Sequence, residues 1–189
     1  IMNNDPSNAD IYGNLYNWYA VVDERELCMN GFRLPSDEEW TILTNYLGGS
    51  SNAGLKMKDD ISWIGSNESG FTALPGGGRQ DYGEYQGFNS GAGFWSSTPY
   101  SDGYAGWYRY LKTSNDNVSR YEGVSNSFSF SIRCLQDDIE GCTHPNATNY
   151  DETANVDDGS CEYETVQIGH QVWMTENLKA TQYNNGEAI

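Results

Sequence analysis

A segment rich in oxygen-bearing side chains lies between Cys142 and Cys161. Calcium in proteins takes about six to eight oxygen ligands from a flexible backbone, and Gly159 provides a tight turn inside this segment. We therefore expect a structural calcium ion here. Asn146 also carries a suitable oxygen, and the predicted ligands are Asn149, Asp151, Asn155, Asp157, Asp158 and Ser160.

The string NVDDGS (155–160) resembles half of a D-x-D-x-D-G calcium loop but lacks the closing Glu of an EF-hand. The segment also resembles short, Cys-flanked, Asp-rich repeats of bacterial surface proteins, some of them similar to thrombospondin calcium repeats. The alternative is a solvated acidic linker closed by a disulfide. His144 is interpreted as a surface residue, because softer metals require a second imidazole or a thiolate.

Aromatic side chains in Gly- and Ser-rich loops offer a second kind of chemistry, because their faces can stack on sugar rings. The predicted ligand-binding residues are Trp63, Tyr82, Tyr85, Tyr100 and Tyr104, with Phe88 beside them. The calcium–sugar tripeptides of C-type lectins (Glu-Pro-Asn, Gln-Pro-Asp, Trp-Asn-Asp) are absent from the sequence. Three other tryptophans, Trp40, Trp95 and Trp107, lie in regular elements and are expected in the core.

Catalysis is not expected. The two histidines, His144 and His170, are far in sequence from any candidate nucleophile, and no Ser-His-Asp or Cys-His set can be assembled. The triple glycine 76–78 is not a phosphate-binding loop, since no Lys-Ser or Lys-Thr follows it, and is predicted to be a tight turn. We therefore predict that the chain is not an enzyme.

The net charge of −17 argues against nucleic acid or anionic lipid as a partner. The acidic residues are concentrated in one segment. Residues 137–164 contain nine Asp or Glu and no Lys or Arg, which is just over half of the net charge. This shift in composition marks the clearest domain boundary in the chain.

The four cysteines match no zinc-binding spacing, and an even number in a loop-rich chain predicts two disulfides. One bond, Cys142–Cys161, would bracket the acidic segment. Disulfides indicate an oxidising compartment, so we expect an extracellular or cell-surface location. No apolar run approaches the length of a membrane span, and any leader or anchor would lie outside these residues.

The expected elements are those of an α+β domain. Ser36 and Glu39 form a capping box that starts a helix with Trp40, Leu43 and Leu47 on one face, ended by Gly48-Gly49. Arg33 before it is interpreted as an ion-pair partner rather than a ligand contact. Residues 1–11 are expected to be irregular, 12–22 helix or strand with helix favoured, and 48–92 mostly loop. Antiparallel strands are predicted at 94–98, 105–111, 117–122 and 127–134, joined by turns at 114–116 and 123–126.

Several strings in the chain resemble the Fibrobacter succinogenes major paralogous domain family. They are YGNLYNWYAV (12–21), GFRLPSDEEW (31–40), NESGFTALPGG (67–77), GFWSST (93–98), SIRCL (131–135) and VQIGHQVWMTENL (166–178). That family is similar to the sulfatase-modifying-factor branch of the C-type lectin-like fold. The resemblance implies such a fold, with a small twisted antiparallel sheet, one clear helix and long Gly-rich loops. It also implies a Cys28–Cys134 disulfide, since lectin-like domains often tie the helical region to the last strand. The reactive cysteines of formylglycine-generating relatives do not carry over, because Cys28 and Cys134 look structural.

The order of these strings is shifted, since the tail at 165–189 resembles the opening of the same domain type. We expect residues 1–137 to form a domain body and 138–164 an acidic linker. Residues 165–189 are expected to form an opening hairpin that is donated either to the next repeat of a long tandem protein or to a neighbouring chain, with Val166, Ile168, Val172 and Trp173 buried there. The predicted function is a non-catalytic repeat that assembles head to tail with copies of itself in a surface fibre, stalk or adhesin. A carbohydrate-binding lectin-like module, with glycans as partners, is the alternative.

Overall fold

The computed structural model describes residues 5–101, 103–123 and 127–177, and the chain divides into two compact units, 1–136 and 137–189. The break between the units lies one residue before the predicted end of the domain body. The acidic linker and the tail belong to the second unit together. Each unit is described by itself.

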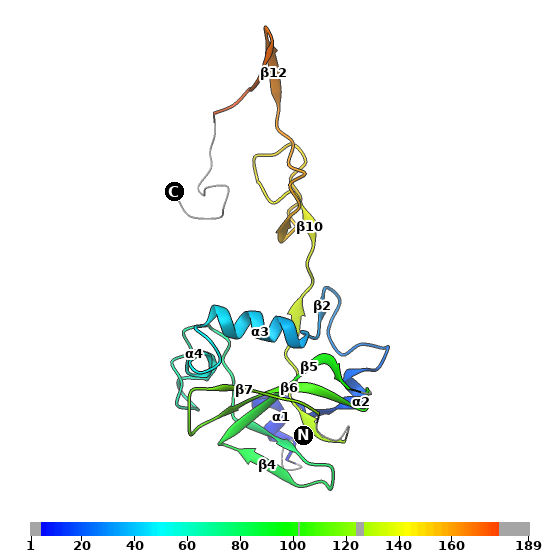
Figure 1. Ribbon diagram of the computed structural model, residues 1–189, viewed down its shortest axis with the longest axis vertical. Coiled ribbons are helices and arrows are strands. Elements are labelled where there is room, and N and C mark those ends of the chain that lie inside the picture. The colour runs from blue at the N-terminus through cyan, green and yellow to red at the C-terminus, as the bar shows by residue number, and fades with distance from the viewer. Residues whose placement is uncertain (1–4, 102, 124–126, 178–189) are drawn as a thin grey trace. The chain divides into compact units, whose positions relative to one another are not determined.

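The first unit is α+β, as predicted (Figure 1). Its helices are α1 (Ser7–Tyr12), α2 (Trp18–Val21), α3 (Asp37–Tyr46) and α4 (Ala53–Met57). Its strands are β1 (Tyr16–Asn17), β2 (Phe32–Arg33), β3 (Gly76–Arg79), β4 (Tyr85–Phe88), β5 (Gly91–Tyr100), β6 (Ala105–Lys112), β7 (Val118–Tyr121), β8 (Ser129–Phe130) and β9 (Leu135–Gln136).

The main sheet has seven strands in the order β1-β8-β3-β5-β6-β7, with β4 paired to β3. The prediction of a purely antiparallel sheet was wrong, because β3 and β5 run parallel and pair Gly77 with Ala92. Strand β9 lies outside this sheet and pairs with β2. The predicted strand at 127–134 is therefore shorter than expected: β8 covers only two of its residues, and β9 begins beyond its predicted end and pairs with a different partner.

Helix α3 begins at the predicted capping box. The Ser36 side chain accepts from the Glu39 N–H, and the Glu39 carboxylate accepts from the Ser36 N–H at 2.7 Å. Arg33 donates to the same carboxylate at 2.8 Å, which confirms its role as an ion-pair partner. Trp40 and Leu47 are buried and Leu43 packs against them, as the spacing predicts.

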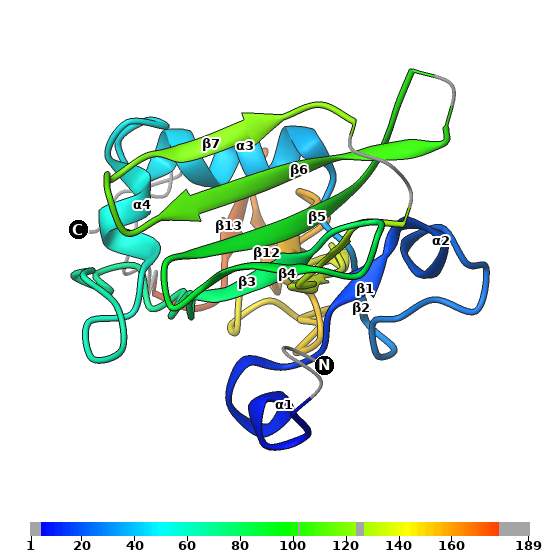
Figure 2. The ribbon, with the colours of Figure 1, turned by 90° about the horizontal axis from the view of Figure 1, so that it is seen from below.

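Helices α3 and α4 cover one face of the sheet (Figures 1 and 2). Alternate side chains of β5, β6 and β7 point into that core, including Ala92, Phe94, Leu111 and Val118. Burial of this apolar surface is the main favourable term in folding. The opposite face of the sheet carries a second cluster around Trp18, Trp95 and Phe130.

The triple glycine forms β3, so the prediction of a tight turn at 76–78 was wrong. The reason lies on the second face, where aromatic rings rest directly on glycine. A Cβ at Gly78 would meet the Phe130 ring at 2.7 Å, and one at Gly76 would meet Tyr12 at 3.4 Å. Glycine in a strand often marks such a close approach, which a side chain would prevent.

Replacing Gly78 with alanine should lower the free energy of unfolding by about 1–3 kcal/mol, because the added methyl group overpacks the Phe130 ring. Urea denaturation measures the change. Adding Phe130→Leu to Gly78→Ala should recover part of the loss, since the smaller side chain makes room. A Gly78→Ala chain as stable as its parent would contradict this packing.

Three shorter elements were not predicted as they occur. Residues 7–12 form α1 where irregular chain was expected, and 12–22 contain both β1 and α2. The segment 48–92, expected to be mostly loop, contains α4, β3 and β4. The turn after β6 is present as predicted, and the predicted turn at 123–126 falls largely on residues 124–126, outside the described residues.

The second unit, over its described residues 137–177, contains four strands. Strand β10 (Glu140–Gly141) pairs in parallel with β11 (Val156–Asp157), and β12 (Thr165–Ile168) forms an antiparallel hairpin with β13 (Gln171–Met174). Both expected disulfides are present, Cys28–Cys134 in the first unit and Cys142–Cys161 in the second.

Candidate functional site: the acidic linker and the tail hairpin

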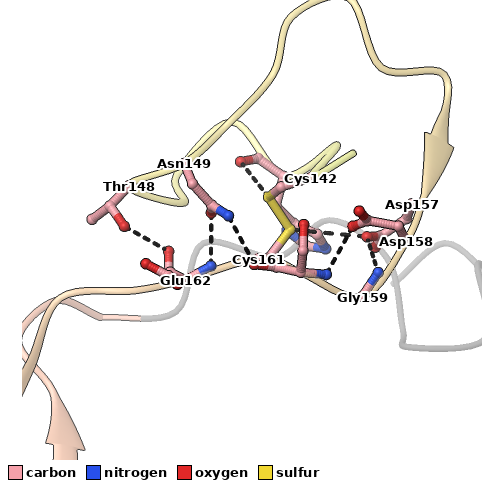
Figure 3. Close-up of a disulfide and its surroundings, with 10 residues drawn as sticks. Cys142, Thr148, Asn149, Asp157, Asp158, Gly159, Cys161 and Glu162 are labelled. Atoms are coloured by element: carbon pink, nitrogen blue, oxygen red, sulfur yellow. Dashed lines mark hydrogen bonds between the residues drawn. A yellow bond between two sulfur atoms is a disulfide. The ribbon is translucent and has the colours of Figure 1, made fainter. Parts of the chain in front are cut away.

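The acidic linker is a compact loop closed by the Cys142–Cys161 disulfide (Figure 3). Cys142 is 1% exposed, so the bond forms the small interior of the loop. Two backbone pairings close the loop further. Strands β10 and β11 pair with each other, and the Thr148 N–H donates to the Glu162 carbonyl at 2.8 Å. The linker thus has defined internal pairing despite its high charge.

Two of the predicted calcium ligands are asparagines that bind backbone on both sides of the amide. Asn149 Oδ1 accepts from the Glu162 N–H and its Nδ2 donates to the Ser160 carbonyl, both at 2.8 Å (Figure 3). Asn155 Oδ1 accepts from the Ile139 N–H at 2.7 Å, and its Nδ2 donates to the Asp137 carbonyl at 2.9 Å. Each side-chain amide therefore bonds to backbone groups as a neighbouring strand would, and it joins two segments that are separated in the sequence.

The predicted aspartate ligands cap local turns. Asp157 Oδ1 accepts from the Gly159 N–H and Asp158 Oδ1 from the Ser160 N–H (Figure 3), and Asp151 accepts from Thr153. Hydrogen bonds from Ser160 and Thr153 lower the pKa of Asp158 and Asp151. Such side-chain caps are typical of Asx turns. Within the described residues, no three His, Cys, Asp or Glu side chains gather as a metal-binding group.

Two further polar residues of the loop lie at a separate hollow. His144 and Asn146 line it together with Tyr163 and the end of β13. The His144 ring packs edge-on against Tyr163, with ring centroids 6.3 Å apart. Asn146 is therefore on a different part of the loop from the turn that contains Asp157 and Asp158.

The tail hairpin is well formed but uncovered. Its register pairs Val166 with Trp173 and Gln167 with Val172, and Gly169 turns with a positive φ of 63°. The register places Val166, Ile168 and Trp173 on one face, and Val172 and Met174 on the other. All eight strand residues are exposed, with Ile168 at 63%, Val172 at 69% and Trp173 at 53%. The hairpin therefore offers apolar surface on both faces. Its four predicted assembly residues, Val166, Ile168, Val172 and Trp173, are uncovered in the single chain.

The predicted sugar-binding aromatics are not gathered in one place. Trp63 is in the core, 5% exposed, and its Nε1 donates to Thr113 Oγ1 at 2.8 Å, so its assignment as a ligand contact was wrong. Tyr82 and Tyr85 belong to the β3–β4 hairpin, whereas Tyr100 and Tyr104 belong to the β5–β6 hairpin. Tyr82 and Tyr104 are exposed, Tyr100 packs edge-on against Trp107, and Phe88 packs against Tyr12.

Trp40 and Trp95 are buried as predicted, but Trp107 is only half-buried, so its placement in the core was wrong. The Arg120 guanidinium lies 3.5 Å from the centre of the Trp107 ring. A group of tyrosines that the sequence interpretation missed, Tyr108, Tyr110 and Tyr121, lines a hollow on the open sheet face. The spacing of Tyr108 and Tyr110 by two in a strand is the signal that places them on one face.

The first unit is thus a disulfide-bonded α+β domain with a mixed sheet and one helix-covered face. The model of the Fibrobacter succinogenes major domain matches residues 1–136, the same span as this unit. The chain belongs to the Fibrobacter succinogenes major domain family, as its sequence strings indicate. The match does not extend to the tail, so the likeness of residues 165–189 to the start of such a domain stays a prediction. No curated protein and no solved structure matches the chain. None of the described helices is both long and apolar enough for a membrane span.

Proposed function

We propose that this chain is a non-catalytic, extracellular structural repeat that assembles head to tail by donating its tail hairpin to a neighbouring copy. The observation that carries the proposal is the uncovered hairpin. A two-stranded hairpin is marginally stable alone in water. This one also exposes large apolar side chains on both faces, so a binding partner that covers them would stabilise it.

The acceptor in this proposal is the first unit of the next copy. In the sequence, exposed apolar side chains precede and follow β1, the two-residue strand at one end of the sheet. They are Ile11 at 60%, Val22 at 54% and Met29 at 69% exposed. The free edge of an end strand can pair with an added strand, and the donated hairpin would extend the sheet there. Donor and acceptor surfaces differ, so the contact is heterologous and propagates as a row unless it closes into a ring.

Other features agree with a surface repeat. The two disulfides suit an oxidising compartment outside the cytoplasm. The first unit, with its helix on one sheet face, its long loops and a disulfide that ties residue 28 to residue 134, supports the finer assignment to a C-type lectin-like fold. In this proposal the disulfide-closed linker separates one domain from the next in a cell-surface fibre, stalk or adhesin.

Replacing Val166 and Trp173 with serine should abolish assembly, because both lie on the same face of the donated hairpin. Sedimentation velocity over a range of concentrations measures this. The parent chain should form species larger than the monomer, and the double variant should stay monomeric. The control is Ile61→Ser, a change of 92% exposed apolar surface on the first unit, which should assemble like the parent.

Mixing the double variant with the parent chain gives a second test, which depends on the direction of hairpin donation. The double variant can accept a hairpin but cannot donate one, so it should terminate rows of the parent chain and shorten them. Assemblies of unchanged size in the mixture, or assembly by the double variant itself, would contradict donation of the hairpin.

Calcium binding by the linker is a further proposal, with Asp157 and Asp158 as central ligands. One oxygen of each carboxylate accepts a backbone N–H, so the ion would bind through the remaining oxygens or replace those hydrogen bonds. Calorimetric titration of the chain with calcium should show saturable heat, and the heat should vanish with Asp157→Ala and Asp158→Ala. Glu152→Ala is the matched control. Absence of heat in the parent chain would leave the linker as a disulfide-closed acidic loop.

A further inference from the structure

The turn between Met29 and Phe32 places an asparagine directly before a glycine. The Phe32 N–H donates to the Met29 carbonyl at 3.0 Å, which closes a turn with Asn30 and Gly31 at its centre. Gly31 has a positive φ of 81°, whereas Asn30 does not have a positive φ. This combination is that of a type II turn, in which the third position favours glycine.

Both central residues of this turn are accessible. Asn30 and Gly31 are exposed, and a Cβ added at Gly31 would meet no atom within 4 Å. The segment 22–31, between α2 and β2, contains neither helix nor strand. Water can therefore reach the Asn30 amide, and the local backbone is not fixed by regular hydrogen bonding.

The two groups that could react with each other are not held elsewhere. Among the described residues, no hydrogen bond is made by the Asn30 side chain or by the Gly31 N–H. Glycine has no Cβ to hinder the approach of its nitrogen to the side chain before it. Asparagine is a thermolabile residue type, and an exposed Asn-Gly turn gives it the least protection from its own backbone.

We propose that Asn30 is a site of spontaneous modification, at which the chain converts this asparagine into aspartate and isoaspartate. The Gly31 nitrogen attacks Asn30 Cγ, and its proton passes to the side-chain nitrogen, which leaves as ammonia. The product is a succinimide ring that joins Asn30 Cγ to the Gly31 nitrogen.

Water then opens the ring at one of its two carbonyl carbons. Opening at Cγ gives aspartate with the original backbone. Opening at the backbone carbonyl of residue 30 gives isoaspartate, in which the chain continues through the former side chain. One water is consumed and one ammonia is released, so the reaction requires no oxidant and no cofactor.

Asn89 in the same unit shows the protection that Asn30 lacks. It also precedes a small residue, but the Ser90 N–H donates to the Gly87 carbonyl at 2.9 Å. Asn89 Oδ1 accepts from the Tyr12 hydroxyl at 3.5 Å. The nitrogen that would attack Asn89 is therefore held by the fold, and this asparagine is the internal control.

The products should disturb the start of β2. Isoaspartate adds a carbon atom to the backbone of a turn whose ends are joined by the Phe32–Met29 hydrogen bond. Strand β2 begins at Phe32 and pairs with β9, and Arg33 in that strand donates to Glu39 at the start of α3. We therefore expect the melting temperature of the first unit to fall as isoaspartate accumulates.

Peptide mapping of the full chain, incubated at 37 °C in mildly alkaline water enriched in oxygen-18, tests the modification. Each asparagine is compared with a synthetic peptide of its own local sequence, which measures the reaction without the fold. Asn30 should incorporate the label at a rate within tenfold of its peptide, whereas Asn89 should react at least tenfold more slowly than its peptide. The other Asn-Gly pair, 185–186, lies outside the described residues and in a different tryptic peptide.

Variants separate the consequences. Asn30→Gln has a side chain one carbon longer, which disfavours ring closure, so it should take up no label at residue 30 and keep its melting temperature during incubation. Freshly prepared Asn30→Asp has the new charge without the added backbone atom, and it should melt above the aged parent chain.

Labelling of Asn30 that is more than tenfold slower than labelling of its peptide would overturn the site, because the turn would then hold the reacting groups apart. A parent chain that accumulates isoaspartate with no fall in melting temperature would overturn the predicted effect on β2. The test requires no assembly, so its result is separate from that of the proposed function.

Discussion

Replacing Asp37 with alanine should lower the free energy of unfolding by about 3–5 kcal/mol, the cost of breaking a buried ion pair by removing one partner. Arg109 is 2% exposed and donates to the Asp37 carboxylate through Nη1. Its Nη2 also donates to the Asp37 carbonyl at 2.8 Å and to Thr41 Oγ1 at 3.0 Å. Arg120 adds a second ion pair to the same carboxylate at 2.9 Å. Without the carboxylate, the buried guanidinium of Arg109 loses the counter-charge with which it pairs. Chemical denaturation measures the loss.

Glu38→Ala is the matched control, since Glu38 is the exposed acidic neighbour in the same helix turn, and it should change stability little.

The dependence of stability on pH supplies a second check. Burial raises the pKa of Asp37, but hydrogen bonds from Arg120 and Arg109 outweigh burial and hold that pKa below its ordinary value. The stabilisation is therefore present above the unfolded pKa of about 4 and is lost as pH falls through the folded pKa. Parent and Asp37→Ala should converge in acid, and a constant difference down to low pH would contradict the ion pair.

Removing the Cys28–Cys134 disulfide by serine substitution should lower the free energy of unfolding of the first unit by about 4–5 kcal/mol. The bond joins residues 106 apart in sequence, and closing a loop of that length greatly reduces the conformational entropy of the unfolded chain. It also attaches the irregular segment before β2 to the chain between β8 and β9. Differential scanning calorimetry should show the first unit melting at a much lower temperature.

The other disulfide provides an internal comparison. Cys142 and Cys161 are 19 residues apart and belong to the second unit. Replacing both with serine should open the linker loop while the first unit melts as before. Equal effects of the two replacements on the first unit would show that its stability does not depend on the long cross-link.

Local signals in the sequence predicted α3 and its start, because a capping box needs only Ser36 and Glu39 three residues apart. The family strings predicted the Cys28–Cys134 bond. The glycines at 76–78 could not be assigned to a strand in this way, since the ring that requires Gly78 to lack a side chain belongs to Phe130, far along the chain. The short extent of β8 and the separate strand β9 likewise depend on which distant segment each one pairs with.

The candidate sites show the same limit. Composition identified the oxygen-rich residues of the linker, but only geometry shows that Asn149 and Asn155 bind backbone groups. Trp63 in a glycine-rich segment suggested a ligand contact, and its partner Thr113 places it in the core instead. The tyrosine-lined hollow draws residues from five strands, so no short motif predicts it.

Hydrogen exchange at the amides of β12 and β13 tests the central claim most directly. In a single chain these strands pair only with each other, and an isolated hairpin is marginally stable, so their amides should exchange quickly at low concentration. If the hairpin is donated to a neighbour, protection should rise with chain concentration and disappear when Val166 and Trp173 are replaced by serine. Fast exchange at every concentration, or protection that does not depend on concentration, would contradict donation between copies.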